Sequence, residues 1–549
     1  MMTFNNVRLN FDQDMIALKI KYACLALMFF INTSVSSQDS VKDNIEYLIE
    51  ININAQLIIE NQIIHCQKSL TVFYRNLNYQ PVWNNSALIQ AFLNELNKAD
   101  KEGLEPKDYH IENITSLLRI IKKTTATEAK LDLVLTDAFL LYASHLLYGK
   151  VNSATLEPQW SLHTGENRII SVLEQAVQNN NIKNSLENIK PKHAIYLGLK
   201  KALEQYKTIK QKGGWQIIPA GSTIKVGDVD PRIPLIRARL IATKDFSRSW
   251  EINSNKYDHD LVNALKLFQV RHGIDIDGEI GFKTMTAMNI NVDERIEQIK
   301  INLERWRWLS RQFGDYYIKV NIADFNLEVI KNGEKIRQHK IIVGRTYRKT
   351  PIFSSKITHL IFNPSWTIPP GIFSADVLPA VRKNIKYLKN KNIYVYDKNG
   401  QIVIPSSVDW NSTVVKSYTY RQPPGFDNAL GSVKFFIPNK FMVYLHDTPS
   451  KDLFEKSERA FSSGCIRVQD PIELAEYLLN DPENYSKKRI NVIINTKKTQ
   501  TVVIKEQPAI HILYWTSFIN DDGVVQFRKD IYKRDGALKE ALLKPAPSL

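Results

Sequence analysis

Between residues 37 and 211 apolar positions recur every three or four residues, which is the spacing of amphipathic helices. The pattern is clearest over residues 87–96 and 131–148, and no cluster of catalytic residue types accompanies it. Helical spacing sustained over this length, without such a cluster, is typical of a structural unit. We therefore predict an all-helical scaffold domain over residues 38–212.

A stretch that contains glycine and proline, residues 213–221, ends the helical pattern. Glycine and proline are the strongest markers of turns and boundaries. Helical spacing resumes beyond this stretch, and a second glycine-rich turn at residues 273–281 separates two of the expected helices. We predict a separate, compact helical unit over residues 225–291.

Strand patterns replace helical ones from residue 315 onward, as short runs rich in β-branched and aromatic residues. These runs lie at residues 316–322, 326–330, 339–343, 360–362, 433–437 and 442–445. Residues 371–422 interrupt them with a helix-like stretch and lysine-rich loops, as an insertion between strands does. We predict a mainly β domain over 315–500 with an inserted cap subdomain at 371–422, a helix at 471–479, and a C-terminal extension at 501–549. The expected fold class is multidomain α+β.

Chain length and composition agree with this division. At about 150 residues per domain, the 549 residues suggest three or four units. With 44% hydrophobic and 24% charged residues the chain can bury several cores, and this composition is not that of a disordered protein. The formal charge of +16 favours polyanionic partners such as nucleic acid, anionic lipid or the bacterial wall. Since the basic residues are spread along the chain rather than gathered in an arm, we expect no nucleic-acid partner.

The N-terminal segment has the layout of an export signal. Lys19 and Lys21 precede an apolar stretch, residues 22–31, and a small, polar run follows at residues 32–37. The apolar stretch is about half as long as a membrane span requires. We predict that residues 1–37 are a signal peptide, with an uncleaved N-terminal anchor as the alternative, and that any membrane contact passes through this segment.

Three cysteines are present, and Cys24 lies inside the predicted signal. The two that remain, Cys66 and Cys465, could form a disulfide, because exported proteins meet an oxidising environment. Only the residues around Cys465 can decide between a disulfide and a reactive thiol.

Two short segments carry the chemistry: residues 444–449, which contain His446, and residues 461–468, which contain Gly464, Cys465 and Arg467. A thiol becomes a useful nucleophile when an imidazole takes its proton or stabilises its thiolate. A glycine before the cysteine lets backbone N–H groups approach an oxyanion, and the arginine can lower the pKa of the thiol or hold a substrate carboxylate. We therefore predict Cys465 as nucleophile and His446 as base.

The other candidates have weaker support. Tyr444 lies two positions before His446 and so faces the same side of a strand, where it lines a substrate pocket or belongs to the core. Trp366 is a second candidate for the pocket wall. The sequence has no second cysteine or histidine at ligand spacing around Cys465, so we expect no metal site and no cofactor.

The smaller helical unit resembles the peptidoglycan-binding domain family. The resemblance rests on Phe268 and Gln269, on His272 and Gly273, and on the Asp-Gly-x-Ile-Gly turn at residues 277–281. The resemblance covers residues 225–291. It implies a small three-helix fold that binds the bacterial wall.

Two motifs resemble those of the L,D-transpeptidase family, with its YkuD-type catalytic domain. They are the His-Asp-Thr sequence at residues 446–448 and the Ser-Ser-Gly-Cys-Ile-Arg sequence at residues 462–467. Asp447 and Ser463 replace a family glycine and a family histidine. Both replacements occur in the large multidomain branch, which also has the Arg-Gln-Pro-Pro-Gly and Asn-Ala-Leu-Gly sequences found here at residues 421–431.

The resemblance implies acyl transfer on peptidoglycan stem peptides, which would be donor and acceptor, with other wall synthases as further candidate partners. Cys465 would attack the third residue of a tetrapeptide, release D-alanine and form a thioester, which an amine of a second stem would convert into a 3–3 cross-link. The N–H groups of Cys465, Gly464 and Ser463 would hold the oxyanion. We therefore expect the chain to act in the periplasm of a Gram-negative bacterium, where an uncleaved signal would anchor it to the inner membrane.

Three questions remain open at this level. Water could intercept the same thioester, which would make the chain an L,D-carboxypeptidase or hydrolase, and a noncatalytic wall-binding scaffold is the alternative outside enzymes. The group that orients His446 has no assignment, because Ser463 stands where the family has histidine. The side chain of Asp447 is expected to point to the opposite face of the strand.

Overall fold

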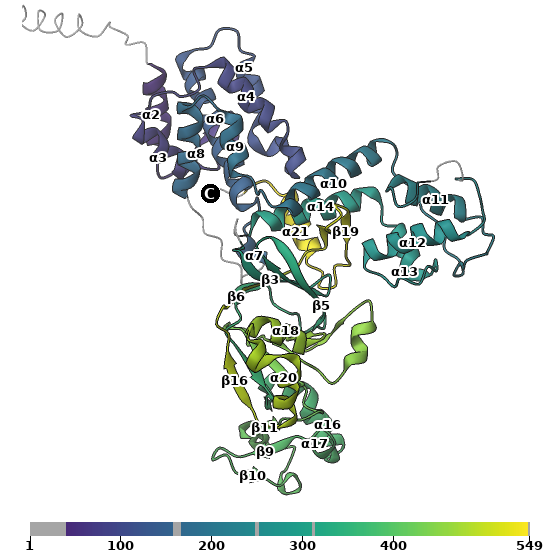
Figure 1. The fold of residues 1–549 in the computed structure, drawn as a ribbon. Helices are drawn as coiled ribbons and strands as arrows, with labels where there is room; N and C mark the ends of the chain where they lie inside the picture. Colours follow the sequence, from purple (N-terminus) through teal and green to yellow (C-terminus); the bar gives the residue numbers. More distant parts are fainter. Residues whose placement is uncertain (1–39, 157–165, 248–251, 310–312, 547–549) are drawn as a thin grey trace, which may run out of the picture.

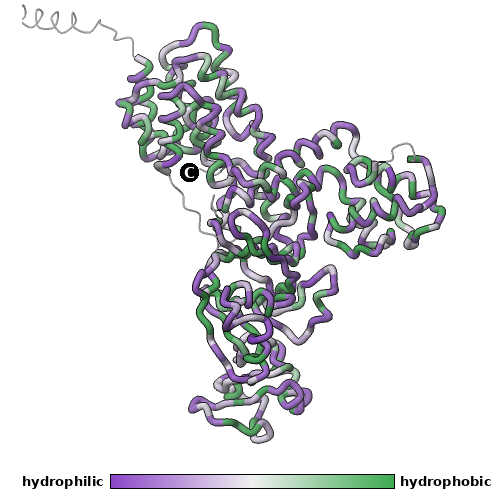
Figure 2. Tube along the Cα trace, in the orientation of Figure 1, coloured by the Kyte–Doolittle hydropathy of each residue, from purple (hydrophilic) through white to green (hydrophobic). Residues whose placement is uncertain are grey.

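The computed structural model describes residues 40–156, 166–247, 252–309 and 313–546. Figure 1 shows a helical body, a smaller helical unit to one side, and a β-sheet body that ends in the cap farthest from the first helices. Hydrophobic and hydrophilic stretches alternate along every one of these parts (Figure 2), so each part can form a core of its own. The predicted signal lies outside the described residues.

The N-terminal region is helical, as predicted. Its elements are α2 (Val41–Ile51), β1 (Ile58–Ile59), β2 (Gln62–Ile63), α3 (Gln67–Asn76), α4 (Ser86–Leu96), η1 (Ala99–Glu102), η2 (Pro106–Tyr109), α5 (Ile111–Leu118), α6 (Thr125–Tyr148), α7 (Ser153–Leu156), α8 (Glu166–Gln178), α9 (Ile182–Ile189) and α10 (Ala194–Gln211). One detail departs from an all-helical region, because β1 and β2 form a small antiparallel hairpin. Its turn residues, Glu60 and Asn61, both have positive φ, which short hairpin turns require.

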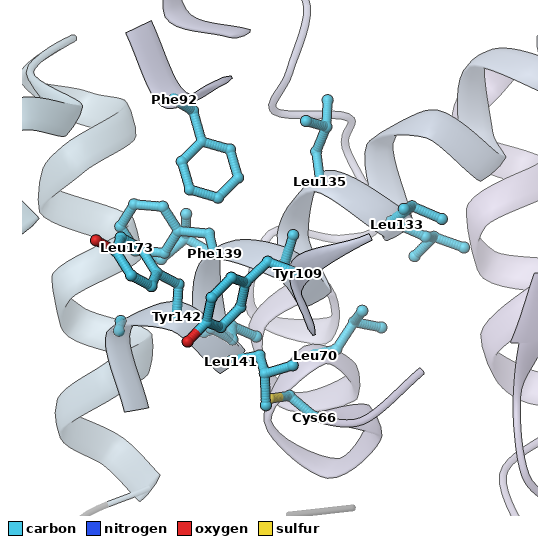
Figure 3. Close-up of a cluster of buried hydrophobic side chains, with 14 of the residues drawn as sticks. Cys66, Leu70, Phe92, Tyr109, Leu133, Leu135, Phe139, Leu141, Tyr142 and Leu173 are labelled. Carbon is cyan, nitrogen blue, oxygen red and sulfur yellow. The ribbon is translucent and has the colours of Figure 1, made fainter. Parts of the chain in front are cut away.

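The central helix of this region is α6, and Figure 3 shows its side chains inside the cluster that α3, α4 and α8 complete. The side chain of Thr124 caps its first turn. In the described residues α6 alone is long and apolar enough to cross a membrane, but 94% of its apolar window is buried inside the protein. A helix that is buried on all sides in this way is the core of a helical body.

Cys66 is fully buried in the same cluster, beside Leu70 and Leu141 (Figure 3). No disulfide joins Cys66 to Cys465 in the described structure. The disulfide considered from the sequence is therefore absent, since one cysteine is core packing of the helical region and the other lies in the β-sheet body.

The smaller helical unit contains α11 (Ile233–Ala242), α12 (His259–His272) and α13 (Phe282–Met288), which pack around their own core. The side-chain amide of Gln269 donates to Asp277 and to the carbonyl of Glu279, and its oxygen accepts from the N–H of Gly278. Gln269 therefore pins the glycine-rich turn to α12. Helix α14 (Val292–Arg307) follows and packs along α10, which joins this unit to the N-terminal region.

The third body is a curled, eleven-stranded mixed sheet in the order β16, β7, β12, β13, β15, β5, β4, β3, β17, β6, with β14 beside β5. Its strands and helices are β3 (Tyr316–Asn321), β4 (Asn326–Lys331), β5 (Glu334–Gly344), β6 (Phe353–Lys356), β7 (His359–Phe362), β12 (Val433–Phe436), β13 (Leu445–His446), η7 (Lys451–Glu455), β14 (Ala460–Ser462), β15 (Ile466–Val468), α18 (Pro471–Leu479), α19 (Pro482–Tyr485), α20 (Lys487–Asn495), β16 (Gln500–Val503) and β17 (Ala509–Leu513). Helix α18 has the predicted bounds. The strand expected at 442–445 is shorter, because Met442 has a φ of 57° and leaves only β13 in the ladder.

The cap inserted between β7 and β12 has a four-stranded sheet and a core of its own. Its elements are β8 (Trp366–Thr367), α15 (Pro370–Ile372), the π-helical turn η4 (Phe373–Val377), α16 (Leu378–Lys383), α17 (Lys386–Asn390), β9 (Tyr394–Tyr396), β10 (Ile402–Val403), η5 (Pro405–Ser407), η6 (Thr413–Ser417) and β11 (Thr419–Gln422). The single helix expected here is broken into short pieces.

The C-terminal extension returns to both larger bodies. Strand β17 lies between β3 and β6 in the main sheet, the hairpin of β18 (Ser517–Ile519) and β19 (Val525–Phe527) packs on α10, and α21 (Asp535–Leu543) packs on α14. Lys150 donates to the carbonyl of Leu542, and Ala546 joins the core of the N-terminal region. The extension is therefore an integral part of the fold.

Candidate active site

One face of the main sheet gathers the predicted catalytic residues. His446 on β13 is in parallel register with Arg467 on β15 and in antiparallel register with Lys434 on β12. Residues in register share a face of the sheet, and successive residues alternate between faces. Leu445 and Ile466, the neighbours along the strands, are fully buried in the core on the other side. The alternation that builds the core thus places His446, Arg467 and Lys434 together.

Cys465 lies just before β15, two positions from Arg467, at the end of the turn formed by residues 462–465. The side chain of Ser462 holds this turn, since it accepts from the N–H of Gly464 at 3.1 Å and donates to the carbonyl of Cys465 at 2.5 Å. Gly464 has a φ of 118°, a region that side-chain-bearing residues rarely adopt. The glycine is therefore required by the backbone of the turn.

The thiol of Cys465 is half-buried, with its sulfur 3.8 Å from the carbonyl oxygen of Met442. Burial raises the pKa of this thiol, and the opposing effects of Tyr444, Lys434 and Arg467 do not outweigh it. The resting thiol is therefore neutral, and the thiolate anticipated from the sequence forms only when a base takes the proton.

His446 is buried, and its Nδ1–H donates to the backbone carbonyl of Asp447 at 2.5 Å. This bond leaves Nε2 unprotonated and able to accept a proton. Burial, together with the positive charges of Arg467 and Lys434, lowers the pKa of His446 to about 3. The imidazole is therefore neutral across the physiological range, as a base must be before it acts.

The orienting group of His446 is thus a backbone carbonyl, which fills the position that the sequence left open. The carboxylate of Asp447 points away from the imidazole, as expected, and accepts from the N–H groups of Ser432 and Thr448 and from Lys451. Within the described residues no hydrogen bond joins the Cys465 sulfur to His446. Catalytic contacts often tighten only when substrate binds.

Lys434 is a site residue that the sequence analysis missed. Its ammonium lies 3.9 Å from the ring centroid of Tyr444. Burial lowers the pKa of Lys434, and the negative charge that Cys465 can carry opposes that shift. A signal existed in the sequence, because Lys434 is a charged residue inside the otherwise apolar strand of residues 433–437.

Like Lys434, Arg467 forms no ion pair with an acidic residue in the described part of the chain. Its Nε is buried without a hydrogen-bond acceptor. Burial and the nearby charge of Arg345 lower the pKa of Arg467. Unpaired, partly buried cations are costly unless a ligand supplies the counter-charge. The site therefore favours an anionic ligand over a neutral one.

Tyr444 and Trp366 line the same site. Burial raises the pKa of Tyr444, and its hydroxyl interacts with the thiol of Cys465 and with Trp366. The rings of Tyr444 and His446 meet edge to face, with centroids 5.6 Å apart. Trp366 is on β8, at the base of the cap, so the cap supplies one wall of the site.

The N–H of Gly464 is engaged by Ser462, so it does not face a substrate in this conformation. The N–H groups of Cys465 and Ser463 have no hydrogen-bond partner among the described residues. The hydroxyl of Ser463 accepts from Arg348 at 2.9 Å, and Arg348 also forms an ion pair with Asp376 on η4 of the cap. One arginine therefore joins the cap to the cysteine turn.

The described part of the chain holds no group of three or more histidine, cysteine, aspartate or glutamate residues arranged for a metal ion. The site instead combines a thiol, a neutral imidazole, two unpaired cations and free backbone N–H groups. This combination can perform nucleophilic acyl transfer on an anionic substrate.

Comparison with known sequences identifies two domains. Residues 315–504 match the L,D-transpeptidase catalytic domain (YkuD), and residues 68–203 match the scaffold domain. A protein of Haemophilus influenzae that carries the provisional name L,D-transpeptidase is 34% identical over 242 residues, which are 44% of this chain and 48% of that protein. The chain thus spans about half the length of the curated relative that it matches.

Two solved L,D-transpeptidases are also similar. Residues 123–326 of the enzyme from Xylanimonas cellulosilytica align over 54% of this chain and 99% of that one, with 12% identity and a TM-score of 0.18. The enzyme from Stackebrandtia nassauensis aligns over 54% of this chain and 97% of that one, with 13% identity and a TM-score of 0.22. Scores this low carry no conclusion about the arrangement of the bodies.

Proposed function

Residues 315–504 are an L,D-transpeptidase catalytic domain, and from this premise we propose that the chain cross-links peptidoglycan with Cys465 as its nucleophile. The observation that carries the proposal is the single sheet face on which Cys465, His446, Arg467 and Lys434 meet. The donor is a tetrapeptide stem, whose carboxylates match the unpaired cations of the site.

The first half-reaction forms a thioester. Nε2 of His446 takes the thiol proton while the sulfur of Cys465 adds to the carbonyl carbon at the L-centre of the third stem residue. The N–H groups of Cys465 and Ser463 donate to the resulting oxyanion. The intermediate collapses with cleavage of the C–N bond to D-alanine, and His446 passes its proton to the departing amine.

The second half-reaction consumes the thioester. An amine of a second stem attacks the thioester carbonyl, His446 takes the proton from that amine, and the proton returns to the sulfur of Cys465 as the C–S bond breaks. The product is a 3–3 cross-link, and no cofactor takes part.

We also propose that the chain acts in the periplasm of a Gram-negative bacterium, where other wall synthases are candidate partners. The lysines and apolar stretch near the N-terminus support export, with cleavage or retention as an anchor both compatible. The three-helix unit at residues 225–291 is proposed to bind the wall, on the strength of the motif in its glycine-rich turn.

The test is incubation of the purified chain with a disaccharide tetrapeptide, with Cys465→Ala as the control. We expect an acyl-enzyme whose intact mass lacks D-alanine, followed by dimeric muropeptides. Tripeptide monomers alone would make the chain an L,D-carboxypeptidase. An absence of both acyl-enzyme and products would leave a noncatalytic wall-binding scaffold.

A further inference from the structure

A buried hydrogen-bond network connects the C-terminal extension to the cysteine turn. The hydroxyl of Tyr532 donates to the carbonyl of Gly344 at 2.6 Å and accepts from the N–H of Thr350 at 3.1 Å. The hydroxyl of Thr350 then donates to the carbonyl of Gly464 at 2.8 Å. Tyr532 and Thr350 are both essentially inaccessible to solvent, so water cannot substitute for these bonds.

Each hydroxyl group in the network both donates and accepts a hydrogen bond. Thr350 Oγ1 donates to Gly464 and accepts from the N–H of Gly344 at 2.9 Å. Tyr532 has one donor and one acceptor bond, and burial raises the pKa of this phenol, which keeps it protonated. A hydroxyl that donates to one fixed backbone group and accepts from another is held in one orientation, so the network is rigid.

Tyr532 is itself fixed from its own side. Its N–H donates to the hydroxyl of Tyr514 at 2.9 Å, and that hydroxyl donates to Asp530 at 2.6 Å. The two tyrosine rings stack with centroids 5.5 Å apart. Lys349 donates to the carbonyl of Tyr532. The extension therefore presents the Tyr532 hydroxyl at a fixed point.

The peptide geometry gives the network a consequence for catalysis. The carbonyl of Gly464 and the N–H of Cys465 belong to one planar trans peptide unit, in which they point in opposite directions. A bond that holds the Gly464 oxygen therefore sets the direction of the Cys465 N–H. Gly464 alone would leave this plane free to rotate, because glycine tolerates many backbone angles.

We propose that Tyr532, acting through Thr350, is a positioning residue that aims the Cys465 N–H at the oxyanion of the acyl-transfer step. The inference rests on the proposed function, because it needs an acylation at Cys465. It assigns a catalytic purpose to the C-terminal extension, whose residues carry no recognisable catalytic motif.

Two reactions of the same thiol separate positioning of the oxyanion donor from general damage to the turn. Acylation by the tetrapeptide donor passes through an oxyanion, whereas alkylation by iodoacetamide is a direct displacement at carbon and forms none. Tyr532→Phe and Thr350→Val should lower the first-order acylation rate constant about tenfold to a hundredfold. The donor's dissociation constant and the alkylation rate should stay at their wild-type values.

Two further variants serve as controls. Thr350→Ser keeps the hydroxyl and should restore acylation to within about threefold of wild type, since the donor group is retained. Tyr257→Phe removes an equally buried phenol bond, to the carbonyl of Gly278 in the three-helix unit, and should change neither reaction. Rate constants are measured on the folded fraction by intact mass, so partial unfolding lowers the amplitude and not the constant.

The possible results decide between the alternatives. If wild type is acylated and Tyr532→Phe and Thr350→Val are acylated at the same rate, the positioning role is overturned and the proposed function stands. A parallel fall of acylation and alkylation would also overturn it, because the turn as a whole would then be damaged. Failure of the wild-type chain to acylate at all would instead remove the proposed function. If Thr350→Val does not fold, the comparison of Tyr532→Phe with Tyr257→Phe decides whether the positioning role holds.

Discussion

Replacing Lys434 by methionine removes the positive charge nearest the aromatic wall of the site while keeping a side chain of similar length. Lys434 is in register with His446, its ammonium lies 3.9 Å from the Tyr444 ring centroid, and it helps to hold down the pKa of Cys465 against burial. Loss of that charge disfavours the thiolate. We therefore expect the pKa of Cys465 to rise further in Lys434→Met.

The size of the effect follows from two opposing terms. Loss of the lysine charge raises the pKa of the thiol, so a smaller fraction of it is ionised at pH 7, and the change is limited because Lys434 is one of several groups that oppose burial. A more basic thiolate is also a better nucleophile, which recovers a little under half of that loss on a logarithmic scale. The reaction rate at pH 7 should therefore fall by up to about tenfold. Above the new pKa the variant should react faster than wild type.

The assay is stopped-flow reaction with a neutral aromatic disulfide between pH 6 and 11, with Cys465→Ala as the blank. Lys440→Met removes an exposed lysine from the neighbouring loop and controls for net charge, and Lys434→Arg keeps the charge in place. An unchanged midpoint in Lys434→Met would refute the electrostatic role. A rate reduced by the same factor at every pH would also refute it, because that pattern indicates misplacement of the sulfur.

Three further predictions concern the base, the cap and the turn. The folded pKa of His446, about 3, lies below its unfolded value of 6.5, so the unfolded chain takes up the proton first and stability falls as pH drops through that window. The free energy of unfolding of wild type, relative to that of His446→Gln, should therefore fall by about 3 kcal/mol between neutral pH and pH 4.5. Hydrogen exchange of the β13 amides measures it, and a difference that does not change with pH would contradict the prediction. Asp376→Asn breaks the partly exposed ion pair with Arg348 and should lower the free energy of unfolding by less than about 1 kcal/mol. Hydrogen exchange across residues 371–422 should nevertheless become faster. Unchanged exchange there would mean that the ion pair does not hold the cap. Gly464→Ala should add about 1–3 kcal/mol of backbone strain and slow acylation. Gly400 has a φ of 78° in an open turn of the cap, so Gly400→Ala should lower stability without slowing acylation. An equal loss of acylation in both variants would disprove a local effect.

The parts of the site that could be predicted depend on local sequence. Strand alternation places Tyr444 and His446 on one face, and the ring contact at 5.6 Å agrees with it. The positive φ of Gly464 accounts for a glycine directly before the nucleophile. Helix α18 has the predicted bounds because its apolar spacing and its N-terminal proline are both local features.

The parts that could not be predicted depend on the register between strands and on contacts between segments far apart in the chain. Lys434 reaches the site only because β12 pairs with β13, and no spacing along the chain encodes that pairing. The contact of Arg348 with Ser463 comes from the loop after β5, and Tyr532 belongs to an extension far along the chain, so spacing along the sequence predicts neither. The Asp447 carbonyl is local, yet its bond to His446 depends on a rotamer that only the packed structure sets.

The two cations of the site act in opposite directions on the catalytic pair. Arg467 and Lys434 lower the pKa of the Cys465 thiol and also lower the pKa of His446, so they favour the thiolate but oppose the imidazolium. The pair therefore rests in its neutral form, and proton transfer requires that the positive charge near His446 be compensated. Under the proposed function the carboxylates of the donor stem supply this compensation, because they bind to the same cations. A site whose base is held neutral at rest and gains proton affinity when its anionic substrate binds has a physical reason to keep both cations unpaired.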